Sequence, residues 1–204
     1  MIRIPSTSSA RLRTPLLGRR PRRLRGFWRD RAGMAATEFA MIAPILLVLF
    51  FGVVEASDAL TAGRRLTLAT NTLADLVAQD IQITHADLNG LFSGMEEIAV
   101  TTDAASTFRV VSLVYDDDDA RVEVDWSRDD NGGTPYAAGA AYTGLADTSI
   151  LNDTSSVIVT EAELSYKPSL TDFVIQTITM ERQSTRWPRR AARVQLCATA
   201  ATCS

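Results

Sequence analysis

An uncharged apolar run at residues 39–54 constrains this chain more than any other feature of its sequence. It lies within residues 34–54, where Glu38 is the one charged residue. At 1.5 Å per residue, a helix of this length spans roughly 31 Å, which matches the hydrocarbon core of a bilayer. The sequence therefore predicts a transmembrane helix over residues 34–54.

Charged residues are distributed unevenly around this segment. Residues 1–33 hold ten Arg and one Asp, whereas residues 55–204 hold eleven basic and twenty-two acidic residues. Because basic flanks remain in the cytoplasm, we expect a cytoplasmic leader over 1–33 and a domain over 55–204 across the membrane. The acidic balance of that domain argues against a nucleic-acid partner, which requires a basic face.

Two other readings of the apolar run stay open. One is the core helix of a soluble protein, although such helices seldom run 16 residues without a charge. The other is a secretory signal peptide that is cleaved after Ala56, behind an unusually long basic region.

Hydrophobic periodicity predicts an α+β domain, with a long helix, a second helix and an antiparallel sheet of about four strands. Helical spacing continues from Met34 to Gln79, a length of roughly 69 Å. Thr84 to Asp87 resemble a capping box that opens the second helix. Alternating residues follow: we expect strands at 107–115, 120–126, 157–166 and 172–185, a hairpin loop at Asp116–Asp119 and a long loop at 127–150. The expected faces are Leu88, Leu91, Phe92, Met95 and Ile98 on the helix; Val122, Val124 and Trp126 on the second strand; Ile158, Ala162, Leu164 and Tyr166 on the third; and Phe173, Val174, Ile175 and Ile178 on the fourth.

Few residues suggest chemistry of their own. Glu55 is expected at the far membrane interface on a solvated face, with capping or pairing as the alternative. The aspartates at 116–119 are expected to form a solvated turn; calcium is the alternative, but an EF-hand pattern fails there. His85 has no companion at ligand spacing and is expected on the surface at a helix start. No metal site, cofactor or catalytic group is predicted.

Two C-terminal features remain ambiguous. Cys197 and Cys203 have five residues between them and lie outside the cytoplasm in this topology, where a small-loop disulfide is favoured over two free thiols. The five arginines near the C-terminus either pair internally with the acidic strands or dock on a partner or on anionic headgroups. They are Arg182, Arg186, Arg189, Arg190 and Arg193.

The motif at the start of the apolar helix is Gly33-Met34-Ala35-Ala36-Thr37-Glu38. A carboxylate at a membrane edge is costly and by default has a partner. The motif resembles the processing site of type IV pilins and pseudopilins. This resemblance implies that a prepilin peptidase cleaves between Gly33 and Met34, and that Glu38 pairs with the new Met34 ammonium of a neighbouring subunit. The plain alternative is a single-pass anchor whose Glu38 snorkels or pairs with Arg31.

Residues 33–55 as a whole resemble the N-terminal signature of the TadE/TadG-like proteins of the tight-adherence (Flp) pilus system. Weaker resemblances occur at residues 124–127, 157–161, 166–168 and 186–189. The family implies a non-enzymatic, single-pass inner-membrane pseudopilin or assembly component with a periplasmic domain. Its implied partners are the lipid bilayer, other pilins, the prepilin peptidase and the pilus assembly machinery. A membrane-tethered periplasmic binding or sensor module is the alternative function.

Overall fold

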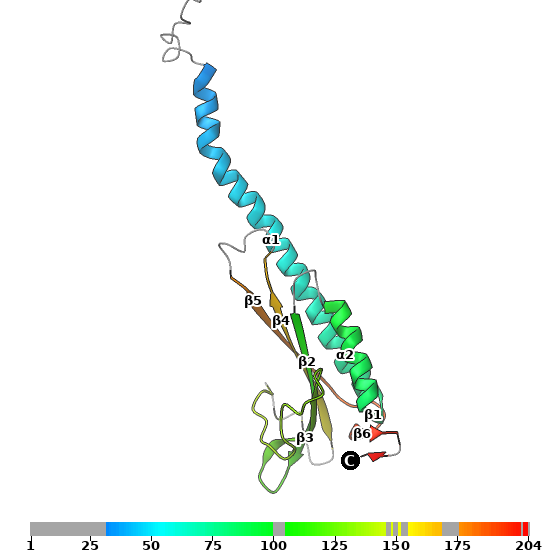
Figure 1. Ribbon diagram of the computed structural model, residues 1–204. Coiled ribbons are helices and arrows are strands. Elements are labelled where there is room, and N and C mark those ends of the chain that lie inside the picture. The colour runs from blue at the N-terminus through cyan, green and yellow to red at the C-terminus, as the bar shows by residue number, and fades with distance from the viewer. Residues whose placement is uncertain are drawn as a thin grey trace, which may run out of the picture. The chain divides into compact units, whose positions relative to one another are not determined.

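The computed structural model describes residues 32–99, 105–145, 148, 151, 155–168, 176–200 and 202–203. The chain divides into two compact units, residues 1–46 and 47–204. Helix α1 (Ala32–Gln79) contributes its first part to one unit and the remainder to the other. All other helices and strands belong to the second unit (Figure 1).

Helix α1 confirms the prediction of one continuous helix reaching Gln79. Pro44 lies inside it, where a proline removes one hydrogen bond of the helix. Several hydroxyl groups that follow donate to the carbonyl four residues earlier, among them Ser57 to Val53 and Thr70 to Leu66. The hydroxyl groups of these side chains are therefore hydrogen-bonded within the helix itself.

Helix α2 (His85–Ala99) begins at the predicted capping box. The Asp87 N–H donates to the Thr84 hydroxyl (3.1 Å), and the Thr84 N–H donates back to the Asp87 carboxylate (3.2 Å). Two otherwise unpaired donors at the helix start are satisfied in this way. Leu88, Phe92 and Met95 are buried as predicted, whereas Ile98 is exposed.

Four antiparallel strands confirm the predicted sheet. They are β2 (Ala105–Asp116), β3 (Arg121–Asp129), β4 (Ser156–Tyr166) and β5 (Ile178–Arg186), in the order β3-β2-β4-β5. The predicted hairpin between β2 and β3 is confirmed, since Asp116 pairs with Arg121 across it. The fourth strand begins later than predicted, at Ile178, and Phe173, Val174 and Ile175 lie outside the described residues.

The sheet buries both faces. On one face, α1 and α2 pack against the sheet. The buried cluster there includes Leu66 of α1, Phe92 of α2, Phe108 of β2 and Leu164 of β4. The predicted third-strand face of Ile158, Ala162, Leu164 and Tyr166 is confirmed in this cluster. On the opposite face, Val111, Leu113, Val122, Val124, Val157 and Val159 pack under Tyr142 and Leu151.

Trp126 lies on the other face from Val122 and Val124, so the predicted common face was wrong. The pairing of β2 with β3 shifts between Ser112, which is opposite Trp126, and Leu113, which is opposite Val124. Asp125 is the extra residue of a β-bulge, and an extra residue reverses the alternation beyond it. Trp126 consequently packs against the helices.

The predicted loop at 127–150 begins later than expected, because β3 continues to Asp129. Further along, Ala141 forms a single bridge with Glu123.

A second sheet was not predicted at all. It comprises β1 (Gln82–Thr84), β6 (Gln195–Thr199) and β7 (Thr202–Cys203), in the order β1-β6-β7. Strands β1 and β6 are parallel, with Ile83 opposite Leu196. Such short strands, far apart in sequence, carry almost no periodic signal.

Candidate functional site

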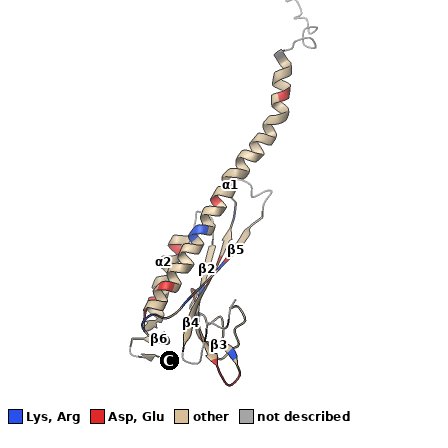
Figure 2. Ribbon diagram, turned by 180° about the vertical axis from the view of Figure 1, so that it is seen from behind, with Lys and Arg blue, Asp and Glu red and all other residues tan. Residues whose placement is uncertain are grey.

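The first part of α1 presents an apolar surface to its surroundings. Within residues 33–79, one helix window is apolar and long enough to cross a membrane, and only 6% of that window is buried. The large exposed side chains include Phe39, Met41, Ile42, Ile45, Leu46, Leu47, Val48, Leu49, Phe50 and Val53. In Figure 2 the ribbon of this part of α1 is tan except for one acidic position near its start. A soluble core helix would be mostly buried, so this exposure counts against that reading and supports a single-pass anchor.

Gly33, Met34 and Glu38 all lie in the first turns of this helix. All three residues are exposed, and a Cβ added at Gly33 would meet no atom within 4 Å. Met34 and Glu38 are four residues apart and therefore share one helix face. The Thr37 hydroxyl donates to the Met34 carbonyl (2.8 Å). The Glu38 carboxylate is thus exposed near the start of α1.

Glu55 is buried, with 4% of its surface exposed, so the expected solvated face was wrong. It shares a helix face with Ala59, Ala62 and Leu66, which packs on the sheet. Tyr166 at the end of β4 is close by. Burial raises the pKa of Tyr166, and the charges of Glu55 and Asp58 raise it further. Glu55 thus marks where α1 meets the domain.

Polar residues on α1 receive three of the five C-terminal arginines. Arg182 donates to the Thr67 hydroxyl (3.0 Å), Arg186 donates to the Asn71 amide oxygen (3.2 Å) and Arg189 pairs with Asp75. Thr67, Asn71 and Asp75 recur every four residues and therefore form a polar ladder along one side of the helix. The side-chain partners of these three arginines lie on α1, whereas the alternative of internal pairing had placed them on the acidic strands. Arg182 and Arg186 also donate to neighbouring carbonyls of β5.

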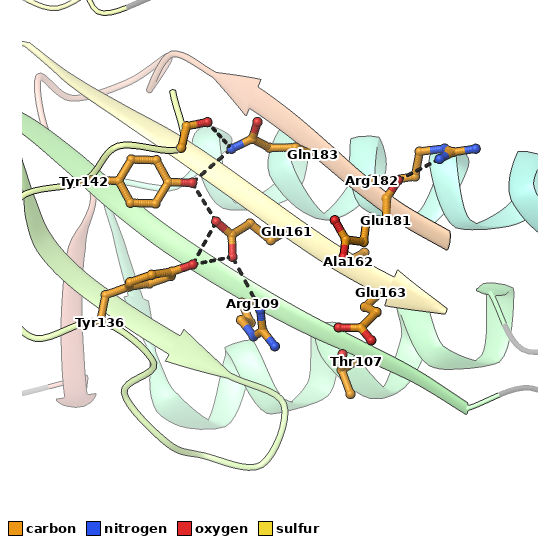
Figure 3. Close-up of a pocket in the computed structure, with 11 residues that line it drawn as sticks. Thr107, Arg109, Tyr136, Tyr142, Glu161, Ala162, Glu163, Glu181, Arg182 and Gln183 are labelled. Carbon is orange, nitrogen blue, oxygen red and sulfur yellow. Dashed lines mark hydrogen bonds and ion pairs between the residues drawn. The ribbon is translucent and has the colours of Figure 1, made fainter. Parts of the chain in front are cut away.

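A cavity of about 500 Å³ opens on the sheet face away from the helices. At its centre, the Glu161 carboxylate accepts hydrogen bonds from the hydroxyls of Tyr142 (2.6 Å) and Tyr136 (2.9 Å) and faces Arg109 at 3.7 Å (Figure 3). Gln183 donates to the Tyr142 hydroxyl (2.9 Å). Burial raises the pKa of both tyrosines, and their bonds to Glu161 raise it further. Both hydroxyls are therefore held protonated, and the network fastens residues 136–142 to the sheet.

The acidic turn at Asp116–Asp119 includes a group with metal-binding spacing. Oxygens of Asp116, Asp119 and Glu123 lie within 4.8 Å of one another. Arg121 lies among them, with an ion pair to Asp119 at 3.0 Å and a second to Glu123. A guanidinium in that position offsets part of the negative charge of the cluster by pairing with two of its three carboxylates.

His85 and the two cysteines lie at the small sheet and at the start of α2. His85 is half-buried at the start of α2, and burial together with the charge of Arg128 lowers its pKa. Cys197 in β6 and Cys203 in β7 are joined by a disulfide. The bond holds β7 to a strand that itself pairs with β1.

Comparison with known protein families gives a match at the exposed helix that starts beside Gly33. A family model described as TadE-like protein matches residues 33–75. This segment is TadE-like. No curated protein and no solved structure matches the chain.

The TadE-like match confirms the resemblance at residues 33–55 and extends it through the polar ladder. The match covers residues 33–75 alone, and through this segment it supports an association with the tight-adherence pilus system. The weaker resemblances at residues 124–127, 157–161, 166–168 and 186–189 lie beyond the matched residues.

Sequence reasoning missed two groups of interacting residues. The polar ladder has a weak signal, because Thr67, Asn71 and Asp75 recur every four residues but lie among other polar residues of the same helix. The network at Glu161 has none, because its tyrosines come from an irregular segment that only the folded chain brings to β4.

Proposed function

We propose that this protein is a TadE-like minor pseudopilin or assembly component of a tight-adherence pilus. In this proposal, residues 34–54 anchor it in the bacterial inner membrane and residues 55–204 form its periplasmic domain. It acts by assembly and not by catalysis. The observation that carries the proposal is the TadE-like match, which begins at Gly33 on a helix whose apolar surface is exposed.

Orientation follows from charge. The leader before the helix holds ten Arg, and such basic flanks remain cytoplasmic. The Cys197–Cys203 disulfide supports an oxidising compartment for the other end of the chain.

The first step of assembly in this proposal is cleavage between Gly33 and Met34 by a prepilin peptidase. Removal of the leader deletes the basic block and creates an ammonium group at Met34. In a bundle of pilin helices, Glu38 of one subunit then neutralises Met34 of its neighbour, and the low dielectric strengthens the pair. Helix packing in the bilayer supplies the remaining binding energy.

N-terminal sequencing of protein extracted from membranes tests the processing step. A mature chain that begins at Met34 supports the proposal. A start at Ser57 supports a signal peptide, and an intact Met1 supports a plain anchor.

The charge pair is tested by Glu38→Ala, with Glu97→Ala on the exposed side of α2 as the control. We expect Glu38→Ala to abolish piliation while the protein still inserts in the membrane, and Glu97→Ala to behave as wild type. Wild-type surface adhesion with Glu38→Ala would contradict the proposed assembly role.

The cavity at Glu161 favours a second candidate, a membrane-tethered periplasmic binding module. Beyond the satisfied network, Glu163 and Glu181 face each other across β4 and β5, and such like-charged pairs are unfavourable without a cation. If Glu163→Gln with Glu181→Gln abolishes the function of the chain while Glu38→Ala does not, the binding module is the better account.

A further inference from the structure

We propose that the segment at residues 187–194 of one copy docks on the acidic turn at Asp116–Asp119 of a second copy anchored in the same membrane. We call the first segment the basic loop. The proposal rests on the proposed function, because it requires neighbouring copies that share one bilayer. It adds a contact between the globular parts to the helix contacts that pilin assembly requires.

The basic loop carries the two C-terminal arginines that form no bond with the polar ladder, Arg190 and Arg193. Arg190 and Arg193 are exposed and have no hydrogen bond or ion pair within the part of the chain that the structure describes. Trp187 precedes them and is 46% exposed. Tryptophan and arginine are the residues most enriched at the energetic centres of protein interfaces.

The loop is also fixed in place from three sides. The Arg189 N–H donates to the Ala78 carbonyl of α1 (2.8 Å), the Ser156 N–H of β4 donates to the Ala192 carbonyl (3.1 Å), and the Trp126 indole of β3 donates to the Val194 carbonyl (2.7 Å). A loop that is ordered before it binds loses little conformational entropy on docking.

Position on α1 separates the basic loop from lipid headgroups. The loop is bonded to Ala78, which lies 24 residues beyond Val54, the end of the proposed span. This distance along the helix is roughly 36 Å. Attraction to a charged membrane surface decays within about 8 Å at physiological salt, so the loop is suited to a protein partner.

The acidic turn supplies the complementary charge. Asp117 and Asp118 are exposed, and their carboxylates have no partner among the described residues, whereas Asp119 pairs with Arg121. Two free arginines on the loop therefore match two free aspartates on the turn. Complementary charges of this kind set the orientation and the rate of association.

Both surfaces lie at the same end of the sheet. Ser156, which holds the loop, is opposite Val114 in the pairing of β4 with β2, and the turn begins two residues after Val114. The other end of β4 is Tyr166, beside Glu55. Loop and turn therefore lie at the same end of the domain, the end opposite Tyr166.

Co-purification of full-length chains with two different tags, expressed in one membrane, tests the contact. With both copies carrying Arg190→Ala and Arg193→Ala, or both carrying Asp117→Ala and Asp118→Ala, we expect recovery of the second tag to fall about fivefold. When one copy carries the loop substitutions and the other carries the turn substitutions, recovery should rise again, because an intact loop still meets an intact turn. Helix contacts contribute equally to every combination.

Matched controls remove the same charges elsewhere. Arg64→Ala with Arg65→Ala on α1, and Glu96→Ala with Glu97→Ala on α2, should keep wild-type recovery. Wild-type recovery with the loop or turn variants, or a mixed pair that stays as low as either variant alone, would overturn the proposal. Processing at Gly33 and piliation that depends on Glu38 do not require this contact, so its failure leaves the proposed function standing.

Discussion

The indole N–H of Trp126 donates a hydrogen bond of 2.7 Å to the carbonyl oxygen of Val194, which joins β3 to the segment before β6. Both residues are buried. The bond exists because the bulge at Asp125 turns Trp126 towards the helices.

Trp126→Phe tests the contribution of this bond. A smaller phenyl ring keeps an aromatic side chain at this position, but the N–H donor and part of the buried ring are lost. We therefore expect the free energy of unfolding to fall by about 1–3 kcal/mol. Urea unfolding of the full chain in detergent measures the change. Trp187→Phe, at an exposed position, is the control and should change stability by less than about 0.5 kcal/mol.

The polar ladder is tested at Asn71. Its amide oxygen accepts bonds from the Ser184 hydroxyl (2.8 Å) and from Arg186. Asn71→Ala leaves both donors without that partner. We expect the free energy of unfolding, measured by thermal unfolding, to fall by about 1–2 kcal/mol. Thr72→Ala, at the next position, removes no bond described in the structure and should have a much smaller effect. Equal losses from the two variants would contradict a specific role for the ladder.

The capping box is tested at Thr84. Thr84→Ala removes the acceptor for the Asp87 N–H, and losing such a cap costs about 1 kcal/mol. Thr84→Ser retains the hydroxyl and should recover most of the stability.

The Thr84 bonds also lower the pKa of Asp87. Their stabilising effect is thus present above the ordinary aspartate pKa of about 3.9 and is lost as pH falls through the lower value in the folded protein.

Alkaline pH tests the network at Glu161. Burial and the bond to Glu161 raise the pKa of Tyr142 in the folded protein, whereas the unfolded value is about 10. The free energy of unfolding is therefore undiminished below about pH 10 and decreases as pH rises towards the folded value. In urea unfolding between about pH 9 and pH 11, Tyr142→Phe should show a shallower decrease than wild type. A decrease of equal steepness would mean that Tyr142 does not titrate differently on folding.

Local signals were sufficient to predict α1, α2 and the strands of the main sheet. The continuous helix to Gln79, the cap at Thr84 and the alternation in β4 each depend on neighbouring residues, so the sequence alone contains them. The match at residues 33–75 likewise begins at the predicted Gly33 motif.

Features that depend on distant residues were not predictable in the same way. The bulge at Asp125 is one inserted residue, and alternation continues through it unchanged in the sequence. Burial of Glu55 depends on which side of α1 meets the sheet. The partners of Arg182 and Arg186 lie more than a hundred residues earlier in the chain.

The parallel pairing of β1 with β6 has a consequence for biogenesis. Gln82 leaves the ribosome long before Gln195, its partner in the small sheet. In the proposed topology residues 55–204 cross the membrane in sequence order, so α1, α2 and β1 would stay in an unfinished state until the final residues are delivered. Over that interval its apolar surfaces would be open to aggregation, so the proposed topology calls for prompt translocation or for a chaperone on the far side of the membrane.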